Sequence, residues 1–270
     1  MSVDGVATGG VHALDRGLQF GDGLFETMAV VDGKVRLLRR HLHRLSAGAE
    51  VLGLHLPDRH LLTTELEGAA ADLGHGVLKL VITRGSGERG YTPPDSARPR
   101  RILISSDWPR FASEVRLMWC GTRLASGGSL AGIKHLNRLE QVLGSREVRM
   151  NGQVDEGLML DSNGNVIEAT GANLFLVDHQ GGLVTPALDD CGVAGVMRDV
   201  VSGLAHDAGI ALTMRPVTVD ETLAAAELFL TSSITGIRPV IEIAGRSLVP
   251  GPVTQSLQDA LAEQEPSCAG

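Results

Sequence analysis

The stretch AGIKHLNRLEQV, residues 131–142, places one lysine between a Gly-Ile pair and the start of an expected helix. Asn137 can cap that helix, and Glu140, three residues later, completes a capping-box pattern. Apolar side chains then recur at helical spacing, at Leu136, Leu139, Val142 and Leu143. Lys134 therefore lies just before the helix, where fixed backbone could hold it as a nucleophile in a cleft. A solvated charge in a turn is the alternative, since most lysines are exposed.

The composition favours a globular protein that acts on small molecules. The chain has 270 residues, of which 43% are hydrophobic, enough for one large domain or two smaller ones. A formal charge of -8 and an aromatic content of 3% argue against the basic stripes and stacking rings of a nucleic-acid surface. We therefore expect a small-molecule substrate and no nucleic-acid partner.

The cysteines and the N-terminus indicate the compartment. Cys120, Cys191 and Cys268 are odd in number and lack paired spacing, which predicts neither a disulfide framework nor a zinc site. The N-terminal MSVDGVATGG has no basic end and no apolar run, and no apolar segment is long enough to span a bilayer. We expect a soluble protein of the reducing cytoplasm, with no metal and no membrane partner.

The first part of the chain reads as mixed strand and helix. A hairpin over residues 25–38 turns at Asp32-Gly33, and an amphipathic helix follows over residues 39–54. Two strands, residues 77–85 and 100–108, flank the segment GSGERGYTPPDSARP, which is either a disordered tip or a mobile binding loop. The strand pattern stops at Trp108-Pro109, which indicates a connector.

The second part is expected to begin as a strand meander and to continue with helices. Strand-like runs separated by turns cover residues 156–188, and a glycine-containing loop leads into a helix over residues 192–209. A short capped helix at residues 218–227 is followed by strand-like runs over residues 228–243, which a hydroxyl-rich turn interrupts.

Several polar groups are candidates for a binding site, and each has a plainer alternative. The helix start at Val196-Met197 could bind an anion with its N–H groups, or be an ordinary tight turn. The hydroxyls of Thr231-Ser232-Ser233 could donate to the same anion, or serve only the turn. Glu168, in an otherwise apolar strand, could pair with a ring nitrogen, or point to solvent. Arg44 could bind phosphate with its planar fork, or extend to water.

The order of these groups along the chain resembles a known family. Three stretches, DRGLQFGDGLFET, TRGSGERGY and GIKHLNRLEQVL, are jointly similar to the fold-type IV pyridoxal-phosphate enzymes. That group contains branched-chain and D-amino acid aminotransferases and the aminodeoxychorismate lyases, and the lyases are the members that these stretches resemble. The resemblance implies an α+β fold with a small N-terminal α/β domain, residues 1–107, a connector, residues 108–120, and a large C-terminal domain, residues 121–270, with a mixed or antiparallel β core.

The resemblance also implies a cofactor, pyridoxal 5'-phosphate, and a role for each candidate residue. Lys134, in the large domain, becomes the Schiff-base lysine, and Glu168 faces the pyridine nitrogen. Thr27 lies beside the reacting carbon, and Arg89 binds a substrate carboxylate. The phosphate is held by Arg44, the backbone of Val196 and Met197, and Ser233. The family also implies a homodimer. The lyase is the activity that the resemblance favours, and an aminotransferase for D-amino or branched-chain substrates is the alternative.

Overall fold

In a computed structural model of the chain, residues 1–264 are described and divide into two compact units. The first unit comprises Met1–Arg110 and Ile133–Asn137, and the second comprises Phe111–Gly132 and the chain from Arg138 onward. Each unit has its own sheet, with six strands in the first and nine in the second over the described residues. This mixed architecture confirms the predicted fold class. Of the three cysteines considered above, Cys268 lies outside the described residues.

The division differs from the predicted domain boundaries in two places. Residues 115–120 of the predicted connector are the beginning of strand β7 (Val115–Leu124), where Val115 and Leu117 are buried. β7 pairs with strands much later in the chain, so the local sequence gives little sign of it. Residues 133–137, which carry Lys134, belong to the first unit although they follow β7, because they pair with the start of strand β3 (Gly23–Val31).

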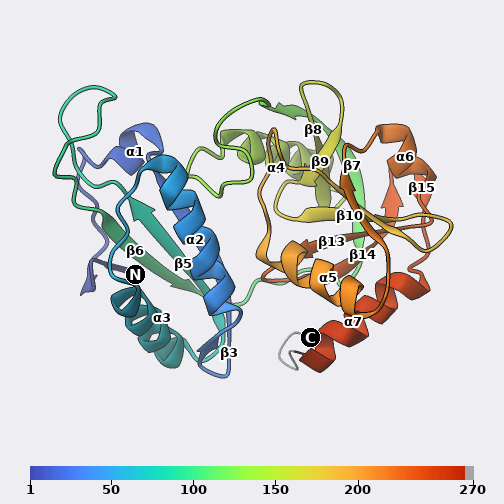
Figure 1. The fold of residues 1–270 in the computed structure, drawn as a ribbon, viewed down its shortest axis with the longest axis horizontal. Coiled ribbons are helices and arrows are strands. Elements are labelled where there is room, and N and C mark those ends of the chain that lie inside the picture. Colours follow the sequence, from blue (N-terminus) through green and yellow to red (C-terminus); the bar gives the residue numbers. More distant parts are fainter. Residues whose placement is uncertain (265–270) are drawn as a thin grey trace. The chain divides into compact units, whose positions relative to one another are not determined.

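The sheet of the first unit is antiparallel, with two helices packed on one face (Figure 1). Its strand order is β2-β1-β6-β5-β3-β4. Besides β3, its elements are β1 (Ser2–Val3), β2 (Val6–Ala7), α1 (Arg16–Phe20), β4 (Lys34–Val35), α2 (Leu38–Leu52), α3 (Arg59–Leu73), β5 (Gly76–Thr83) and β6 (Arg100–Ser106).

The hairpin turn, the packing of α2 and the start of α3 in this unit each follow from nearby residues. Asp32 and Gly33 both have positive φ, 50° and 70°, as the predicted two-residue hairpin turn between β3 and β4 requires. α2 buries Leu42 and Leu45 against apolar side chains of β3 and β5, which gives the unit its core. α3 was not predicted, although Asp58 caps it by accepting hydrogen bonds from the backbone of His60 and Leu61.

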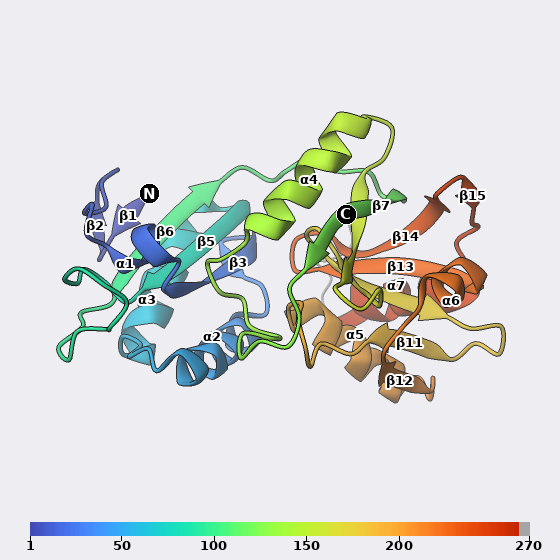
Figure 2. The same cartoon turned by 90° about the horizontal axis from the view of Figure 1, so that it is seen from above.

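The sheet of the second unit closes on itself. β9 pairs with β8 and also with β10, so the strands β10-β13-β14-β7-β8-β9 form a barrel filled with Leu and Val side chains. Figures 1 and 2 show α5 and α7 against β13 and β14. Besides β7, its elements are α4 (Leu139–Asn151), β8 (Glu156–Asp161), β9 (Val166–Ala169), β10 (Asn173–Val177), β11 (Leu183–Pro186), α5 (Val196–Asp207), β12 (Leu212–Arg215), α6 (Val219–Ala224), β13 (Glu227–Ser232), β14 (Gly236–Ile243), β15 (Arg246–Ser247) and α7 (Pro252–Gln264).

The predicted capping box at the start of α4 is wrong. Arg138 occupies the N-cap position and makes no side-chain cap hydrogen bond. The Asn137 amide instead donates to the carbonyl of Gly21, at 3.2 Å, and the Glu140 carboxylate accepts from the backbone of Ala125, at 3.0 Å. Both side chains are used by partners far away in the sequence, so the local pattern was misleading. Within residues 1–264, no helix combines the length and the apolar character needed to cross a membrane.

Candidate active site

Lys134 is held by rigid backbone in the first unit. The Phe25 N–H donates to the Lys134 carbonyl at 3.1 Å, and the Leu136 N–H donates to the Gly23 carbonyl at 3.0 Å. This short antiparallel pairing extends the edge of β3. The Lys134 ammonium lies 4.4 Å from the centroid of the Phe25 ring, within the range of a cation–π contact. Lys134 is therefore a half-buried and oriented side chain rather than a fully solvated one.

The sheet face that carries Phe25 also carries Thr27 and a second lysine. Thr27 lies two residues after Phe25 and is paired with Lys79 of β5, so all three side chains are on one face of the sheet. The Lys79 ammonium is 4.9 Å from the Phe25 centroid. The predicted nucleophile, the predicted hydroxyl and an additional cation thus share one face, which suits an anionic ligand.

Arg44 projects from α2 into a buried ion cluster. Glu26, 1% exposed, accepts from Arg44 Nε at 2.9 Å with one oxygen, and from Arg44 Nη2 with the other. His41 Nδ1 lies 2.6 Å from the second oxygen. Burial alone would raise the pKa of Glu26, but the hydrogen bonds from His41 and Arg44 and the charge of Arg44 hold that pKa below its ordinary value. Arg44 is therefore fixed by a carboxylate instead of extending to water.

Glu168 is buried in the second unit, so the solvent-facing alternative is wrong. The side chain is 4% exposed, and Oε2 accepts from the Val193 N–H at 2.9 Å and from Asn173 Nδ2 at 3.4 Å. Strand register pairs Glu168 with Asn173, and Asn173 with Thr231. These three polar side chains therefore lie in one row across β9, β10 and β13, on the outer face of the barrel.

The row of polar side chains formed by Glu168, Asn173 and Thr231 contacts the segment that leads into α5, through Asn173. Asn173 Nδ2 also donates to the carbonyl of Val193 at 2.9 Å, and a Cβ atom at Gly195 would lie 1.9 Å from Asn173 Oδ1. Gly195 is therefore required for this close approach, and as the N-cap residue it makes no side-chain cap hydrogen bond. The first N–H groups of α5, at Val196 and Met197, suit an anion. Among the described residues, Thr231 Oγ1 is buried without a hydrogen-bond partner.

The neighbouring hydroxyl residues at the turn after β13 have different roles. Ser232 Oγ lies 2.7 Å from Thr235 Oγ1 and accepts from the Thr235 N–H, so Ser232 serves the turn itself. Ser233, the predicted phosphate contact, is half-buried, and its role remains a prediction. Arg89, the predicted substrate contact, is exposed in the loop between β5 and β6, where Arg16 donates to the next three carbonyls along the chain.

Three residues of these groups were missed by sequence reasoning. Lys79 stands out in hindsight, because it is the exposed residue of a strand that is otherwise buried. Glu26 lies on the same face of β3 as the core residues Leu24 and Met28, and a buried acid on such a face needs a cation. Asn173 carries no local signal, since its role depends on the pairing of β9 with β10 and on the position of Gly195.

Comparisons with known proteins agree on one family. Residues 23–243 match Amino-transferase class IV. The crystal structure of 4-amino-4-deoxychorismate lyase from Pseudomonas aeruginosa matches with a TM-score of 0.93 and 46% identity, over 98% of both chains. Aminodeoxychorismate lyase from Vibrio harveyi is 33% identical over 88% of this chain and 89% of its own length. D-alanine aminotransferase from Bacillus licheniformis is 29% identical over 92% of this chain and 89% of its own length.

Proposed function

The chain belongs to the amino-transferase class IV family and is thus a pyridoxal-phosphate-dependent enzyme, and we propose that it is the lyase that converts 4-amino-4-deoxychorismate to 4-aminobenzoate and pyruvate in folate biosynthesis. The observation that carries this proposal is the similarity to the Pseudomonas aeruginosa lyase over almost the whole of both chains. The face shared by Lys134, Thr27 and Lys79 supports it, because a base, a hydroxyl and a cation are what this elimination needs.

The residues present fit the cofactor. Lys134 would bind its aldehyde carbon, and the buried Glu168 would hold the ring nitrogen protonated, with Asn173 and the Val193 N–H fixing the carboxylate. Arg44, the N–H groups of Val196 and Met197, and Ser233 would hold the phosphate. When bound, pyridoxal phosphate supplies an electron sink for the substrate's C4 carbanion.

The side chains of the shared face would then move the protons. The Lys134 amine would take the proton from C4 of the substrate as a general base. Thr27 Oγ1 would deliver a proton to the enolpyruvyl group as it leaves the neighbouring carbon. Loss of the proton and the ether together makes the ring aromatic. Lys79 and Arg89 would bind the substrate's two carboxylates, because each presents a cation.

A fold-type IV aminotransferase for D-amino or branched-chain substrates is the second candidate, favoured by the similarity to D-alanine aminotransferase. The test supplies chorismate, glutamine and an aminodeoxychorismate synthase, and measures 4-aminobenzoate and pyruvate without an added keto acid. We expect both products from the wild type and neither from Lys134→Ala. Wild-type protein that forms neither product but consumes an amino acid when a keto acid is added would favour the aminotransferase.

The assembly and compartment of the protein are also part of the proposal. The resemblance of the sequence to fold-type IV enzymes leads us to propose a homodimer in the cytoplasm. Light scattering coupled to size-exclusion chromatography, applied to the cofactor-loaded protein, should give twice the mass of the 28.4 kDa chain. A monomer at micromolar concentration would contradict the proposed dimer and leave the proposed reaction unaffected.

A further inference from the structure

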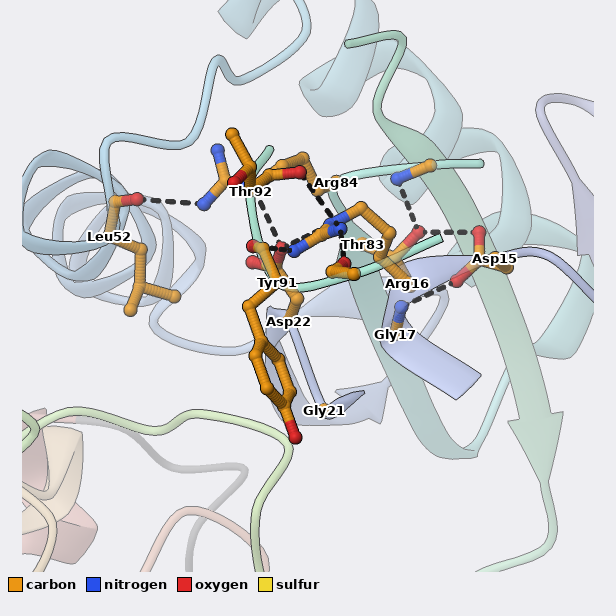
Figure 3. A network of polar contacts seen from close by, with 12 residues as sticks. Asp15, Arg16, Gly17, Gly21, Asp22, Leu52, Thr83, Arg84, Tyr91 and Thr92 are labelled. Carbon is orange, nitrogen blue, oxygen red and sulfur yellow. Dashed lines mark hydrogen bonds and ion pairs between the residues drawn. The ribbon is translucent and has the colours of Figure 1, made fainter. Parts of the chain in front are cut away.

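Residues 90–92 of the loop between β5 and β6 are held by the side chain of a buried arginine (Figure 3). Arg16, in α1, is 3% exposed. Its Nη1 atom donates to the carbonyls of Gly90 at 3.1 Å and Thr92 at 3.4 Å, and its Nη2 atom donates to the carbonyl of Tyr91 at 2.7 Å. Three consecutive carbonyls thus converge on one guanidinium, an arrangement that we call the Arg16 clamp.

The base of the clamp is rigid. Arg16 Nε donates to Asp22 Oδ2 at 2.9 Å, and Arg84 Nε donates to the same oxygen at 2.8 Å. Burial would raise the pKa of Asp22, but hydrogen bonds from Arg84 and Arg16 and their charges lower it below its ordinary value, so Asp22 stays ionised. Arg84 turns its other nitrogens away from the loop, to the carbonyls of Leu52 and Gly53 at the end of α2.

The loop itself is shaped for the clamp. Gly90 has a φ of 106°, a conformation that L side chains rarely adopt, and this helps successive carbonyls turn toward one donor. The Phe20 ring covers the clamp, with the Arg16 guanidinium 4.9 Å from its centroid and the Tyr91 ring 5.4 Å away. Arg89 immediately precedes Gly90, is exposed, and lines a hollow of about 560 Å³ together with Glu88, Phe20 and Tyr91.

We propose that Arg16 is a positioning residue, which fixes residues 90–92 so that Arg89 is presented to a carboxylate of the substrate. This inference rests on the proposed function, in which Arg89 binds that carboxylate. The physical reason is that an unanchored loop samples many conformations, and only some of them place its arginine where it can bind the substrate. The apparent dissociation constant is then the intrinsic one divided by the fraction of molecules in the competent conformation. The charge-assisted hydrogen bonds of the Arg16 clamp order the loop when the protein folds, so that this conformational entropy is not lost again when the substrate binds.

The test compares Arg16→Gln, Arg16→Lys and Gly90→Ala with the wild type, all as cofactor-loaded full-length protein. We first measure the rate at which trypsin cuts after Arg89, with the fragments identified by mass. Cleavage requires local opening of the loop, so we expect Arg16→Gln and Gly90→Ala to be cut roughly tenfold faster or more. Arg16→Lys keeps the positive charge but loses the planar guanidinium, so its rate of cleavage after Arg89 should lie between those of these two variants and the wild type.

Steady-state kinetics then separate positioning from a general structural role. We expect KM for aminodeoxychorismate to rise about ten- to a hundred-fold in Arg16→Gln, with kcat within about threefold of the wild type. Arg84→Gln is the matched control, because the Arg84 side chain shares Asp22 with Arg16 but bonds to Leu52 and Gly53 instead of residues 90–92, and this variant should be cut after Arg89 at the wild-type rate. Gly90 is exposed and a methyl group there meets no atom within 4 Å, so that variant still decides the question if Arg16→Gln does not fold.

The outcomes are distinct. Unchanged cleavage after Arg89 in both Arg16→Gln and Gly90→Ala would overturn the clamp. Faster cleavage with an unchanged KM, or a fall in kcat and cofactor occupancy without a rise in KM, would overturn the positioning role. A wild-type enzyme that forms no 4-aminobenzoate would refute the proposed function and with it the role given to Arg89, whereas the trypsin result would stand or fall by itself.

Discussion

Removing the charge of Glu26 should weaken cofactor binding although Glu26 is not expected to touch the cofactor. The carboxylate holds Arg44 by two hydrogen bonds and His41 by one, in a site where Glu26 is only 1% exposed. In Glu26→Gln the new amide group must face a donor of Arg44 or His41, so at least one charge-assisted bond is lost. Such bonds contribute about 1.5–3 kcal/mol, and a broken buried ion pair costs about 3–5 kcal/mol.

We therefore expect Glu26→Gln to lower the free energy of unfolding of the cofactor-free protein by about 2–4 kcal/mol. Cofactor affinity should fall roughly ten- to a hundred-fold, as in Arg44→Ala, because the guanidinium is no longer oriented. Urea unfolding and a cofactor titration followed by absorbance measure the two effects. Wild-type cofactor affinity in both Glu26→Gln and Arg44→Ala would refute the assignment of Arg44 to the phosphate.

Glu65 provides the matched control. It also receives two hydrogen bonds from one arginine, Arg101, at 2.8 Å and 2.9 Å, but its side chain is 23% exposed against 2% for Glu26. Water screens that pair, so Glu65→Gln should cost about 1 kcal/mol or less and leave cofactor affinity unchanged. A loss of affinity in Glu65→Gln equal to that in Glu26→Gln would show that the assay reports general destabilisation.

The same cluster predicts a pH dependence. The folded-state pKa of Glu26 lies below its ordinary value of 4.5, so its stabilising contribution is complete above that value and is lost as the pH falls through the lower folded-state pKa. The contribution of Glu26 to stability should therefore decline below about pH 4.5, and the difference in stability between wild type and Glu26→Gln should shrink there. A difference that stays constant down to the acid transition would contradict the lowered pKa.

Four further predictions address the remaining groups. Glu168→Gln should keep cofactor occupancy but lose most turnover, measured as absorbance and 4-aminobenzoate formation, and equal turnover at full occupancy would exclude a ring-nitrogen contact. Thr27→Ala should lose activity by about 10²–10⁴-fold or somewhat less while Thr27→Ser keeps most of it, and wild-type rates in Thr27→Ala would remove its proton-delivery role. Lys79→Ala should raise KM more than it lowers kcat, and an unchanged KM would separate Lys79 from the substrate. Burial raises the pKa of the Cys120 thiol to about 11 and that of Cys191 to about 12, so at pH 8 mass mapping should find both unmodified by a thiol reagent in the folded protein; rapid labelling would contradict the burial.

The parts of the fold that could be predicted are those with short-range causes. Asp32-Gly33 turns a hairpin because both residues tolerate positive φ, and Thr218 caps α6 through the Glu221 N–H, as the sequence TVDE suggests. The start of α5 after Gly195 was predictable for the same reason. Each signal depends on residues within one turn of the feature.

The parts that could not be predicted depend on residues far apart in the chain. Asn137 has the sequence context of a helix cap, but Gly21 takes its amide. Glu168 has apolar neighbours in sequence, and its partners come from the start of β10, at Asn173, and from the loop before α5, at Val193, whose positions the strand pattern does not specify. Arg44 was selected as a phosphate ligand by resemblance, whereas Glu26, which holds it, lies eighteen residues earlier in another element.

The parallel pairing of β7 with β14 constrains when the second unit can form during translation. Val115 is a register partner of Val240, although one belongs to the first strand of the barrel and the other to the last. A ribosome that has synthesised β7, β8 and β9 has exposed the apolar edge and inner face of an open sheet, and the nascent chain cannot close it until β14 has emerged. Contacts between such distant segments fold slowly, and an open edge invites association with other chains. Stalled or truncated chains that end before Gly236 should therefore be clients of chaperones, while the first unit's β3, β5 and β6 can already pair.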